Sequence, residues 1–230
     1  MMAGMAVRVE IISIGTLSRN PFWGEAGAVR ASHATTTLIR EGATHVLVDP
    51  SLPAEVLVHR LSERAGIGPD RIDQVFLTNF RPIHRRGLPA FPDADWLIAR
   101  EEREAIEAHL KKVIEETTAA GDTESRREAE EELAILGRTQ PAPEKLAPSI
   151  HLFPSPGVTP GSAALLVPEA HTWVIAGDAI ITREHYDEGR IFERCVDPEQ
   201  ARESFVEITE VADIIVPGHG NMFLADRRFE

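Results

Sequence analysis

The chain has 230 residues, a formal net charge of −13 at neutral pH and a single cysteine, Cys195. Such an acidic chain lacks the basic surface by which proteins bind nucleic acids or anionic membranes, and we expect neither as a partner. One cysteine rules out an internal disulfide and a cysteine-rich zinc site. No signal peptide or membrane-length apolar run is evident, so we expect a single domain over residues 1–230 in the cytoplasm.

The N-terminal part of the chain predicts strands around one helix. The strands are short runs rich in apolar and β-branched residues, at 7–14, 36–40, 45–48, 74–77 and 96–99. The second and third surround a glycine-containing turn and predict a hairpin. Pro53 can begin a helix because its fixed φ suits the first turn, and this helix is expected to end near Ala65, before Gly66.

Residues 101–136 form a charged segment with helical periodicity. An apolar stripe recurs at helical spacing and consists of Ile106, Leu110, Val113 and Ile114. Gly121 interrupts the pattern, so we expect two helices, inserted at about 101–138. The stripe is predicted to pack on the sheet domain or on a partner chain. An exposed arm over the sheet, an arm that forms a homodimer and a lid over the active site are the alternatives.

The C-terminal part predicts a second group of strands and one more helix. Residues 140–148 contain three prolines and are interpreted as a linker back into the sheet. Strands are predicted at 150–153, 163–167, 172–175 and 213–216. Residues 198–211 predict an amphipathic helix whose apolar face holds Ala201, Phe205, Ile208 and Val211. Alternating strands and helices of this kind indicate sheets with helices packed outside them.

Four loops that follow predicted strands carry the polar residues of interest, and strand-end loops are where rigid scaffolds hold chemistry. The first, residues 78–87, reads Thr-Asn-Phe-Arg-Pro-Ile-His-Arg-Arg-Gly. We expect a loop there because Pro82 suits neither a strand nor a helix interior. The others lie at 155–162, 176–179 and 216–220, and contain Pro-Gly-Val-Thr-Pro-Gly, Gly-Asp and Pro-Gly-His-Gly.

In order and spacing, these loops resemble the metallo-β-lactamase superfamily over nearly the whole chain. The family's first motif, Thr-His-x-His-x-Asp-His-x-Gly-Gly, is matched by Thr78, His84 and Gly87. The aspartate of Gly-Asp corresponds to Asp178, and the last histidine, in Pro-Gly-His-Gly, corresponds to His219. The resemblance implies an α/β fold, a four-layer αββα sandwich of two mixed sheets, with the helical arm as an insertion.

The chain departs from the family at four ligand positions, which hold Asn79, Arg81, Ile83 and Val158. The family binds two metals, and the Gly-Asp carboxylate bridges them. Carried over to this chain, the resemblance implies that the first metal loses all of its own ligands, because neither a valine nor a cationic guanidinium can ligate. The second metal loses one ligand, at Ile83.

His84, Asp178 and His219 are then a candidate set for one divalent metal, zinc rather than iron(II). Zinc would acidify a bound water, whereas iron(II) in this set would indicate oxygen chemistry. Ordinary hydrogen bonds could satisfy the same side chains, so a site without a metal is the alternative.

Arg81 places a cation where the family has an imidazole. We expect its guanidinium to pair with Asp178, because an unpaired buried carboxylate costs several kcal/mol or becomes protonated. A guanidinium in the pocket also suits a carboxylate or phosphate ligand. Arg85 and Arg86 follow closely, and we interpret these two as solvated loop residues.

Two functions remain open at this point. In the first, the chain is a metal-dependent hydrolase of a small ester, thioester, lactone or amide; Asp178 and Arg81 are catalytic, and Arg81 with Asn79 binds an anionic substrate. In the second, it is a catalytically silent anion-binding or regulatory protein that kept the fold. Two further histidines near these loops, His33 and His185, have no assignable role.

Overall fold

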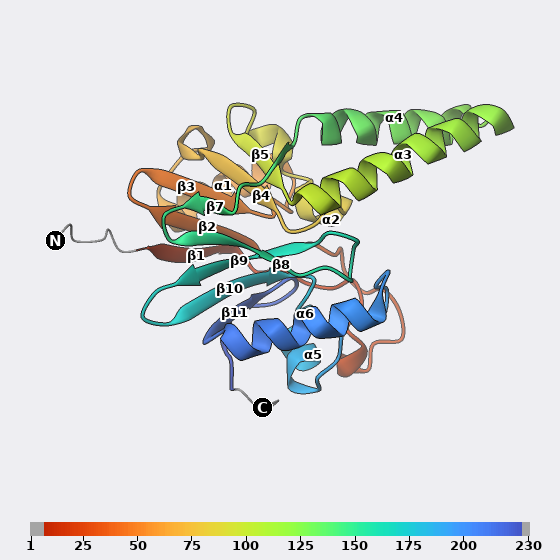
Figure 1. Ribbon diagram of the computed structural model, residues 1–230. Helices are drawn as coiled ribbons and strands as arrows, with labels where there is room; N and C mark the ends of the chain where they lie inside the picture. The colour runs from red at the N-terminus through yellow and green to blue at the C-terminus, as the bar shows by residue number, and fades with distance from the viewer. Residues whose placement is uncertain (1–6, 227–230) are drawn as a thin grey trace.

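The structure, a computed structural model that describes residues 7–226, consists of two six-stranded sheets packed face to face with helices outside them (Figure 1). The chain builds the first sheet completely before it begins the second. Both sheets contain parallel and antiparallel pairs, so the expected αββα sandwich of two mixed sheets is confirmed.

The first sheet has the strand order β1-β2-β3-β4-β5-β6. Its strands are β1 (Arg8–Ser13), β2 (Thr36–Glu41), β3 (Thr44–Val48), β4 (Gln74–Leu77), β5 (Asp95–Ile98) and β6 (Gln140–Pro141). From β3 to β6 the strands run parallel. Because parallel strands end at the same edge, Asp49 after β3 and Thr78 after β4 lie beside each other.

The second sheet has the strand order β12-β11-β10-β9-β8-β7. Its strands are β7 (Lys145–Ala147), β8 (Ile150–Pro154), β9 (Ala163–Pro168), β10 (Thr172–Gly177), β11 (Ile214–Pro217) and β12 (Phe223–Leu224). Strands β10 and β11 run parallel, so the loops that follow them leave the sheet at the same edge. Those loops carry Asp178 and His219.

The α-helices of the described range are α1 (Ala54–Ala65), α2 (Pro82–Arg85), α3 (Arg100–Ala120), α4 (Thr123–Gly137), α5 (Arg183–Asp187) and α6 (Pro198–Val211). Short 3-10 turns lie at Pro21–Trp23, Pro69–Arg71 and Leu88–Ala90. The expectation of a loop throughout residues 78–87 is wrong, because Pro82 begins the one-turn helix α2. At a first helical position the missing N–H of proline costs no hydrogen bond.

Two other expectations about the C-terminal part are also wrong. Residues 140–148 form the edge strands β6 and β7 of the two sheets, so they are more than a linker. Prolines are tolerated there because an edge strand has one side without ladder hydrogen bonds. Val211 is 38% exposed and does not share the buried face of α6, which includes Ala201, Phe205 and Ile208.

Three apolar clusters form the core, one between the sheets and one on the outer face of each. The inner cluster includes Val48 and Phe76 from the first sheet and Leu165 and Val216 from the second. Side chains of α1 pack on the outside of the first sheet, and side chains of α6 pack on the outside of the second. Within residues 7–226, no helix is long and apolar enough to cross a membrane.

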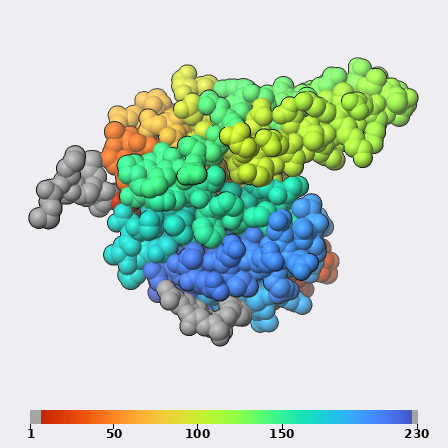
Figure 2. Space-filling view, in the orientation of Figure 1, coloured from red at the N-terminus to blue at the C-terminus, as the bar shows by residue number. Residues whose placement is uncertain are grey.

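Helices α3 and α4 form a hairpin that projects from the body of the molecule (Figures 1 and 2). Gly121 ends α3 with a left-handed φ of 72°, and Asp122 caps α4, as the break in the sequence pattern predicted. The apolar stripe is half-buried: Ile106 and Leu110 pack against the core of the first sheet. The base of the hairpin therefore belongs to the sheet domain, and a homodimer through the arm stays a prediction.

Candidate active site

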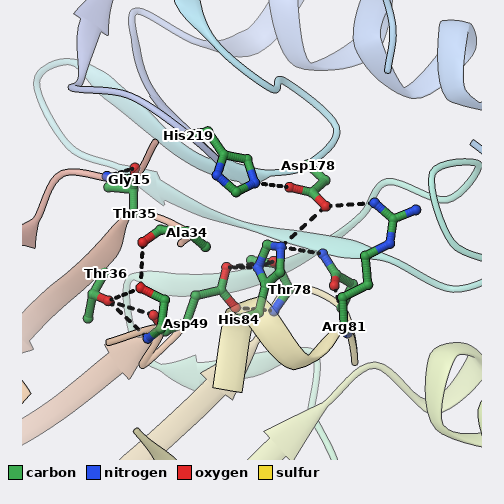
Figure 3. Close-up of polar contacts among 12 residues, drawn as sticks. Gly15, Ala34, Thr35, Thr36, Asp49, Thr78, Arg81, His84, Asp178 and His219 are labelled. Atoms are coloured by element: carbon green, nitrogen blue, oxygen red, sulfur yellow. Dashed lines mark hydrogen bonds and ion pairs between the residues drawn. The ribbon is translucent and has the colours of Figure 1, made fainter. Parts of the chain in front are cut away.

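Three buried side chains, each from a segment that follows a strand, meet at one edge of the sandwich (Figure 3). They are His84 on α2, Asp178 after β10 and His219 after β11. One potential ligand atom of each lies within 4.8 Å of the others. His84 Nε2 lies 3.2 Å from Asp178 Oδ2, and His219 Nε2 lies 3.3 Å from Asp178 Oδ1. The residues predicted as metal ligands thus lie together.

Asp49, a residue that the sequence analysis did not select, orients His84. Asp49 Oδ2 lies 2.9 Å from His84 Nδ1 and accepts the Thr78 hydroxyl at 2.7 Å. A carboxylate at Nδ1 places a proton on that nitrogen and directs Nε2 toward Asp178, as in metal-ligating histidines. The signal that could have found Asp49 is an acidic residue directly after a strand that pairs in parallel with β4.

His219 is oriented by a backbone group. Its Nδ1 lies 2.8 Å from the carbonyl oxygen of His33, so Nδ1 carries the proton and Nε2 faces Asp178. His33 thus contributes its backbone, and its own ring binds the carbonyl of Ile14 at 3.0 Å. Gly218 is required beside His219, because a Cβ atom there would lie 2.7 Å from Asp178 Oδ1.

In this cluster, burial and the neighbouring charges shift the pKa values in opposite directions. Burial alone lowers the pKa of His84, but the carboxylates of Asp178 and Asp49 outweigh it and raise that pKa to about 10. Burial by itself favours the neutral form of Asp178, but the imidazoles of His84 and His219 hold the pKa of this carboxyl well below its usual range. When no metal binds, the cluster is a charged hydrogen-bonded group at neutral pH.

The predicted pairing of Arg81 with Asp178 is confirmed. Arg81 Nη1 donates to Asp178 Oδ2 at 3.0 Å, and Nη2 donates to the carbonyls of Val158 at 3.2 Å and Arg194 at 3.0 Å. The guanidinium also lies over the ring of Phe192, 5.1 Å from its centroid. The Arg81 side chain is 27% exposed and that of Asp178 only 1%, so Arg81 links the buried carboxylate to solvent.

Asn79 is fully buried, and the oxygen and the nitrogen of its side-chain amide both have partners within the protein. Its Oδ1 accepts the backbone N–H of Arg81 at 3.0 Å, and its Nδ2 lies 3.3 Å from His84 Nε2. The amide can donate to Nε2 only when that nitrogen is unprotonated, which is the form of His84 that can ligate a metal and not the charged form of the metal-free cluster. The contact of Asn79 with substrate stays a prediction, and the structure adds that this amide already contacts Arg81 and His84.

The helical hairpin holds the backbone of the loop that carries Arg81. Glu102 of α3 is fully buried, and its two carboxylate oxygens accept the N–H groups of Phe80 and Gly161, each at 3.0 Å. Arg85 donates to the carbonyl of Phe80 at 2.8 Å and pairs with Glu132 of α4. Arg85 is 7% exposed, which corrects its interpretation as a solvated loop residue.

A cavity of about 330 Å³ opens beside the cluster. Arg81, Asp178 and His219 line it, and His185 of α5 contributes another part of the wall. The remaining wall includes Ile83 and residues of the loop between β1 and β2. Guanidinium and imidazole groups outnumber carboxylates in this wall, so the cavity suits an anionic ligand better than a cationic one.

The donor set fits one divalent cation. Both histidines direct Nε2 to a common centre, and Asp178 Oδ1 is buried without a well-formed hydrogen bond among the described residues. Two imidazoles and one carboxylate suit zinc or iron(II) with open coordination positions. The side chains of Arg81 and Val158 offer no ligand atom for a second cation, and the amide of Asn79 is already engaged.

Residues 29–219 match the family model for the metallo-beta-lactamase superfamily. A solved protein from Thermotoga maritima is 15% identical, with a TM-score of 0.67, over 95% of this chain and 99% of that one. AidC, a dizinc quorum-quenching lactonase in complex with a product, is 16% identical with a TM-score of 0.65, over 81% of this chain and 72% of that one.

AiiA from B. thuringiensis, with N-decanoyl-L-homoserine bound at its active site, is 17% identical to this chain. The TM-score is 0.65, and the likeness covers 95% of this chain and 94% of that one. At such identities, the likeness to these solved structures establishes the fold alone. No curated protein matches the chain in sequence.

Proposed function

Because the chain belongs to the metallo-β-lactamase superfamily, we propose that it is a divergent hydrolase that cleaves a small, anionic ester, thioester, lactone or amide. The observation that carries this proposal is the cluster of His84, Asp178 and His219 at a cavity whose wall also presents the Arg81 guanidinium. Two solved relatives of the same fold have an N-acyl-homoserine bound, which favours a lactone or ester among these substrates.

The proposal includes one divalent metal at most, zinc rather than iron(II), held by His84, Asp178 and His219. Such an ion would supply a Lewis acid for the scissile carbonyl or an acidified water. Asp49 would keep His84 Nε2 directed at the site, and the carbonyl of His33 would do the same for His219.

Arg81 is the proposed substrate contact and oxyanion stabiliser. A guanidinium offers five N–H donors, and the bonds to Asp178, Val158 and Arg194 leave donor capacity on the side that lines the cavity. A carboxylate of the substrate, or the oxygen that becomes negative during acyl transfer, can accept from these N–H groups. Asp178 would fix the guanidinium in position.

One observation favours the alternative, a catalytically silent anion-binding protein. Arg81 already binds three acceptors within the protein, and Asn79 is fully engaged. A site whose donors are satisfied internally can retain its fold without turnover.

The test combines elemental analysis of the purified protein with a panel of substrates. The hydrolase predicts about one zinc per chain and turnover of at least one ester, thioester, lactone or amide. Within the panel, an aryl ester that bears a carboxylate should exceed its neutral counterpart in kcat/KM by roughly tenfold or more, because the cavity is cationic. If the protein contains no metal and turns over no substrate of the panel, the hydrolase is rejected in favour of the binding protein.

The matched variants are Arg81→Ala and Arg86→Ala. Arg86 is exposed and comes from the same loop, so its loss should leave the preference for the charged ester unchanged. Arg81→Ala should abolish that preference and, because Asp178 loses a cationic partner, raise the zinc affinity. Retention of the preference in Arg81→Ala would remove Arg81 from the substrate site.

A further inference from the structure

His185 forms a part of the cavity wall that the proposed function does not use. It lies in α5, is 4% exposed, and lines the same cavity as Arg81, Asp178 and His219. The ring of Phe22 packs edge-on against it, with the centroids 4.8 Å apart. A buried imidazole held this closely has a defined orientation.

One hydrogen bond holds the Nδ1 side of this imidazole. His185 Nδ1 lies 2.9 Å from the hydroxyl oxygen of Thr182, and the backbone N–H of His185 donates to the same oxygen at 3.4 Å. The hydroxyl can either donate to Nδ1 or accept from it. When Nδ1 donates, Nε2 is the nitrogen with a free lone pair, and in this tautomer Nε2 can accept a proton.

A carboxylate beside this imidazole is also held in place. Glu184 Oε1 accepts the indole N–H of Trp23, from the loop between β1 and β2, at 2.8 Å. The negative charge of Glu184 favours the protonated form of His185. The Thr182 hydroxyl therefore orients the imidazole, and Glu184 can stabilise the ring while it holds a proton.

We infer that His185, in the wall of the cavity that Arg81 also lines, is the general base of the proposed hydrolysis through its Nε2. The inference rests on the proposed function and adds the residue that moves the proton. Thr182 is a positioning residue, because it acts only through His185.

The step is balanced without any other reactant. His185 Nε2 takes a proton from a water molecule as the water oxygen forms a bond to the carbonyl carbon of the ester. The carbonyl electron pair moves onto its oxygen, which Arg81 stabilises. When the tetrahedral intermediate collapses, the bond to the leaving oxygen breaks, and Nε2–H returns the proton to that oxygen. Ester and water become acid and alcohol, and His185 is neutral again.

The surroundings keep His185 ready to accept a proton. Burial lowers its pKa, and this effect together with Arg190 and His219 outweighs the opposing charges of Glu184 and Glu193. The ring is therefore unprotonated at neutral pH, as a base must be.

The kinetic test uses the full chain and the carboxylate-bearing aryl ester of the panel. His185→Gln should lower kcat by about 10²- to 10³-fold with KM nearly unchanged, since general base catalysis contributes on this order. Its zinc content should equal that of the wild type, because His185 is outside the ligand set. His171→Gln, at an exposed turn, is the matched control and should keep the wild-type kcat.

The positioning role of the Thr182 hydroxyl has its own test. Thr182→Val removes the hydroxyl and should lower kcat, whereas Thr182→Ser keeps it and should restore most of the loss. Nitrogen-15 NMR of the histidine rings at neutral pH should show His185 with a proton on Nδ1 and none on Nε2. A proton on Nε2, or a doubly protonated ring, would overturn the inference whatever the activity.

The outcomes separate the two proposals. If the wild type turns over no member of the panel, the proposed function fails and the role of His185 fails with it. If the wild type is active and His185→Gln keeps kcat within about threefold, less than any general base contributes, the inference alone fails. A loss of zinc in His185→Gln would mean that the variant acts through the metal site instead.

Discussion

At the scale of single residues, the buried carboxylate of Asp178 needs positively charged partners. The carboxylate is almost fully buried, and it contacts two imidazoles and one guanidinium. Removal of a positive neighbour would leave a buried charge, which costs more than the contact itself contributes. Arg81 can supply that charge without a metal because its long side chain reaches from α2 to the loop after β10, which is why the replacement of an imidazole by arginine is chemically coherent.

The same residues predict how stability depends on pH when metal is removed. Because the folded pKa of His84 is raised from 6.5 to about 10, its contribution is fully present below pH 6.5 and is lost as pH rises toward 10. Because the folded pKa of Asp178 is lowered, its contribution is present above its usual pKa of 3.8 and is lost as pH falls below that. The metal-free protein should therefore be most stable between about pH 4 and 6.5.

Urea unfolding in the presence of a chelator measures this dependence. Between pH 6.5 and 9 the free energy of unfolding should fall by on the order of 1–3 kcal/mol, and His84→Gln should flatten the decline. Excess zinc should reverse the slope, because metal binding requires an unprotonated His84. A metal-free stability that rises through this range would contradict the charged cluster.

Sequence reasoning found residues whose chemistry shows in their type and missed those whose role depends on geometry. Arg81 stands out because a cation replaces a ligand, and its partner follows from the buried charge. Asp49 and Glu102 are acidic residues in ordinary sequence contexts. The parallel pairing of β3 with β4 brings Asp49 to His84, and the packing of α3 brings Glu102 to the N–H groups of Phe80 and Gly161. Both contacts become visible only in the folded structure.

At the scale of elements, the hairpin of α3 and α4 positions the active-site loop. Glu102 of α3 accepts the N–H of Phe80, and Glu132 of α4 pairs with Arg85 of α2, which donates to the carbonyl of Phe80. Gly161 must lack a side chain there, because a Cβ atom would lie 2.0 Å from the backbone nitrogen of Glu102. An insertion that projects into solvent therefore has a base that the site requires.

This arrangement predicts a large difference between two neighbouring glutamates. Glu102→Ala leaves two buried N–H groups without an acceptor and should destabilise the protein by about 2–4 kcal/mol. Glu101→Ala, at an exposed position of the same helix turn, should change stability by less than about 0.5 kcal/mol. Urea unfolding of both variants provides the measurement, and equal effects would show that Glu102 is not the anchor of the loop.

Elements that a clear sequence signal marks were predicted well, and those without one were missed. The strand at Gln74–Leu77 has the expected bounds because an apolar run marks it, and the first helix ends at Ala65 as expected because a glycine follows. The one-turn helix α2 and the two-residue strand β6 were missed. Neither segment contains an apolar run or a period, and only tertiary contacts stabilise segments this short.

At the scale of the whole molecule, the sandwich explains why so many ligand positions can change without loss of the fold. The three apolar clusters lie between and outside the sheets, whereas His84 on α2 and the loop residues Asp178 and His219 lie together at one edge. Burial of apolar surface supplies most of the driving force for folding. The fold thus depends on residues that the site does not use.

The corresponding prediction is that the fold persists without metal. Zinc bound to the native state would add roughly 3 kcal/mol at a hundredfold excess over its Kd, which for a chain of this size raises Tm by about 6–12 °C. A chelator should therefore lower Tm by no more than this amount, because Arg81 and the two imidazoles still neutralise Asp178. Thermal unfolding with and without EDTA gives the shift, and near-ultraviolet circular dichroism at 25 °C should stay unchanged. Loss of that signal in EDTA would make the metal structural, and Arg81 would then not be a sufficient partner for Asp178.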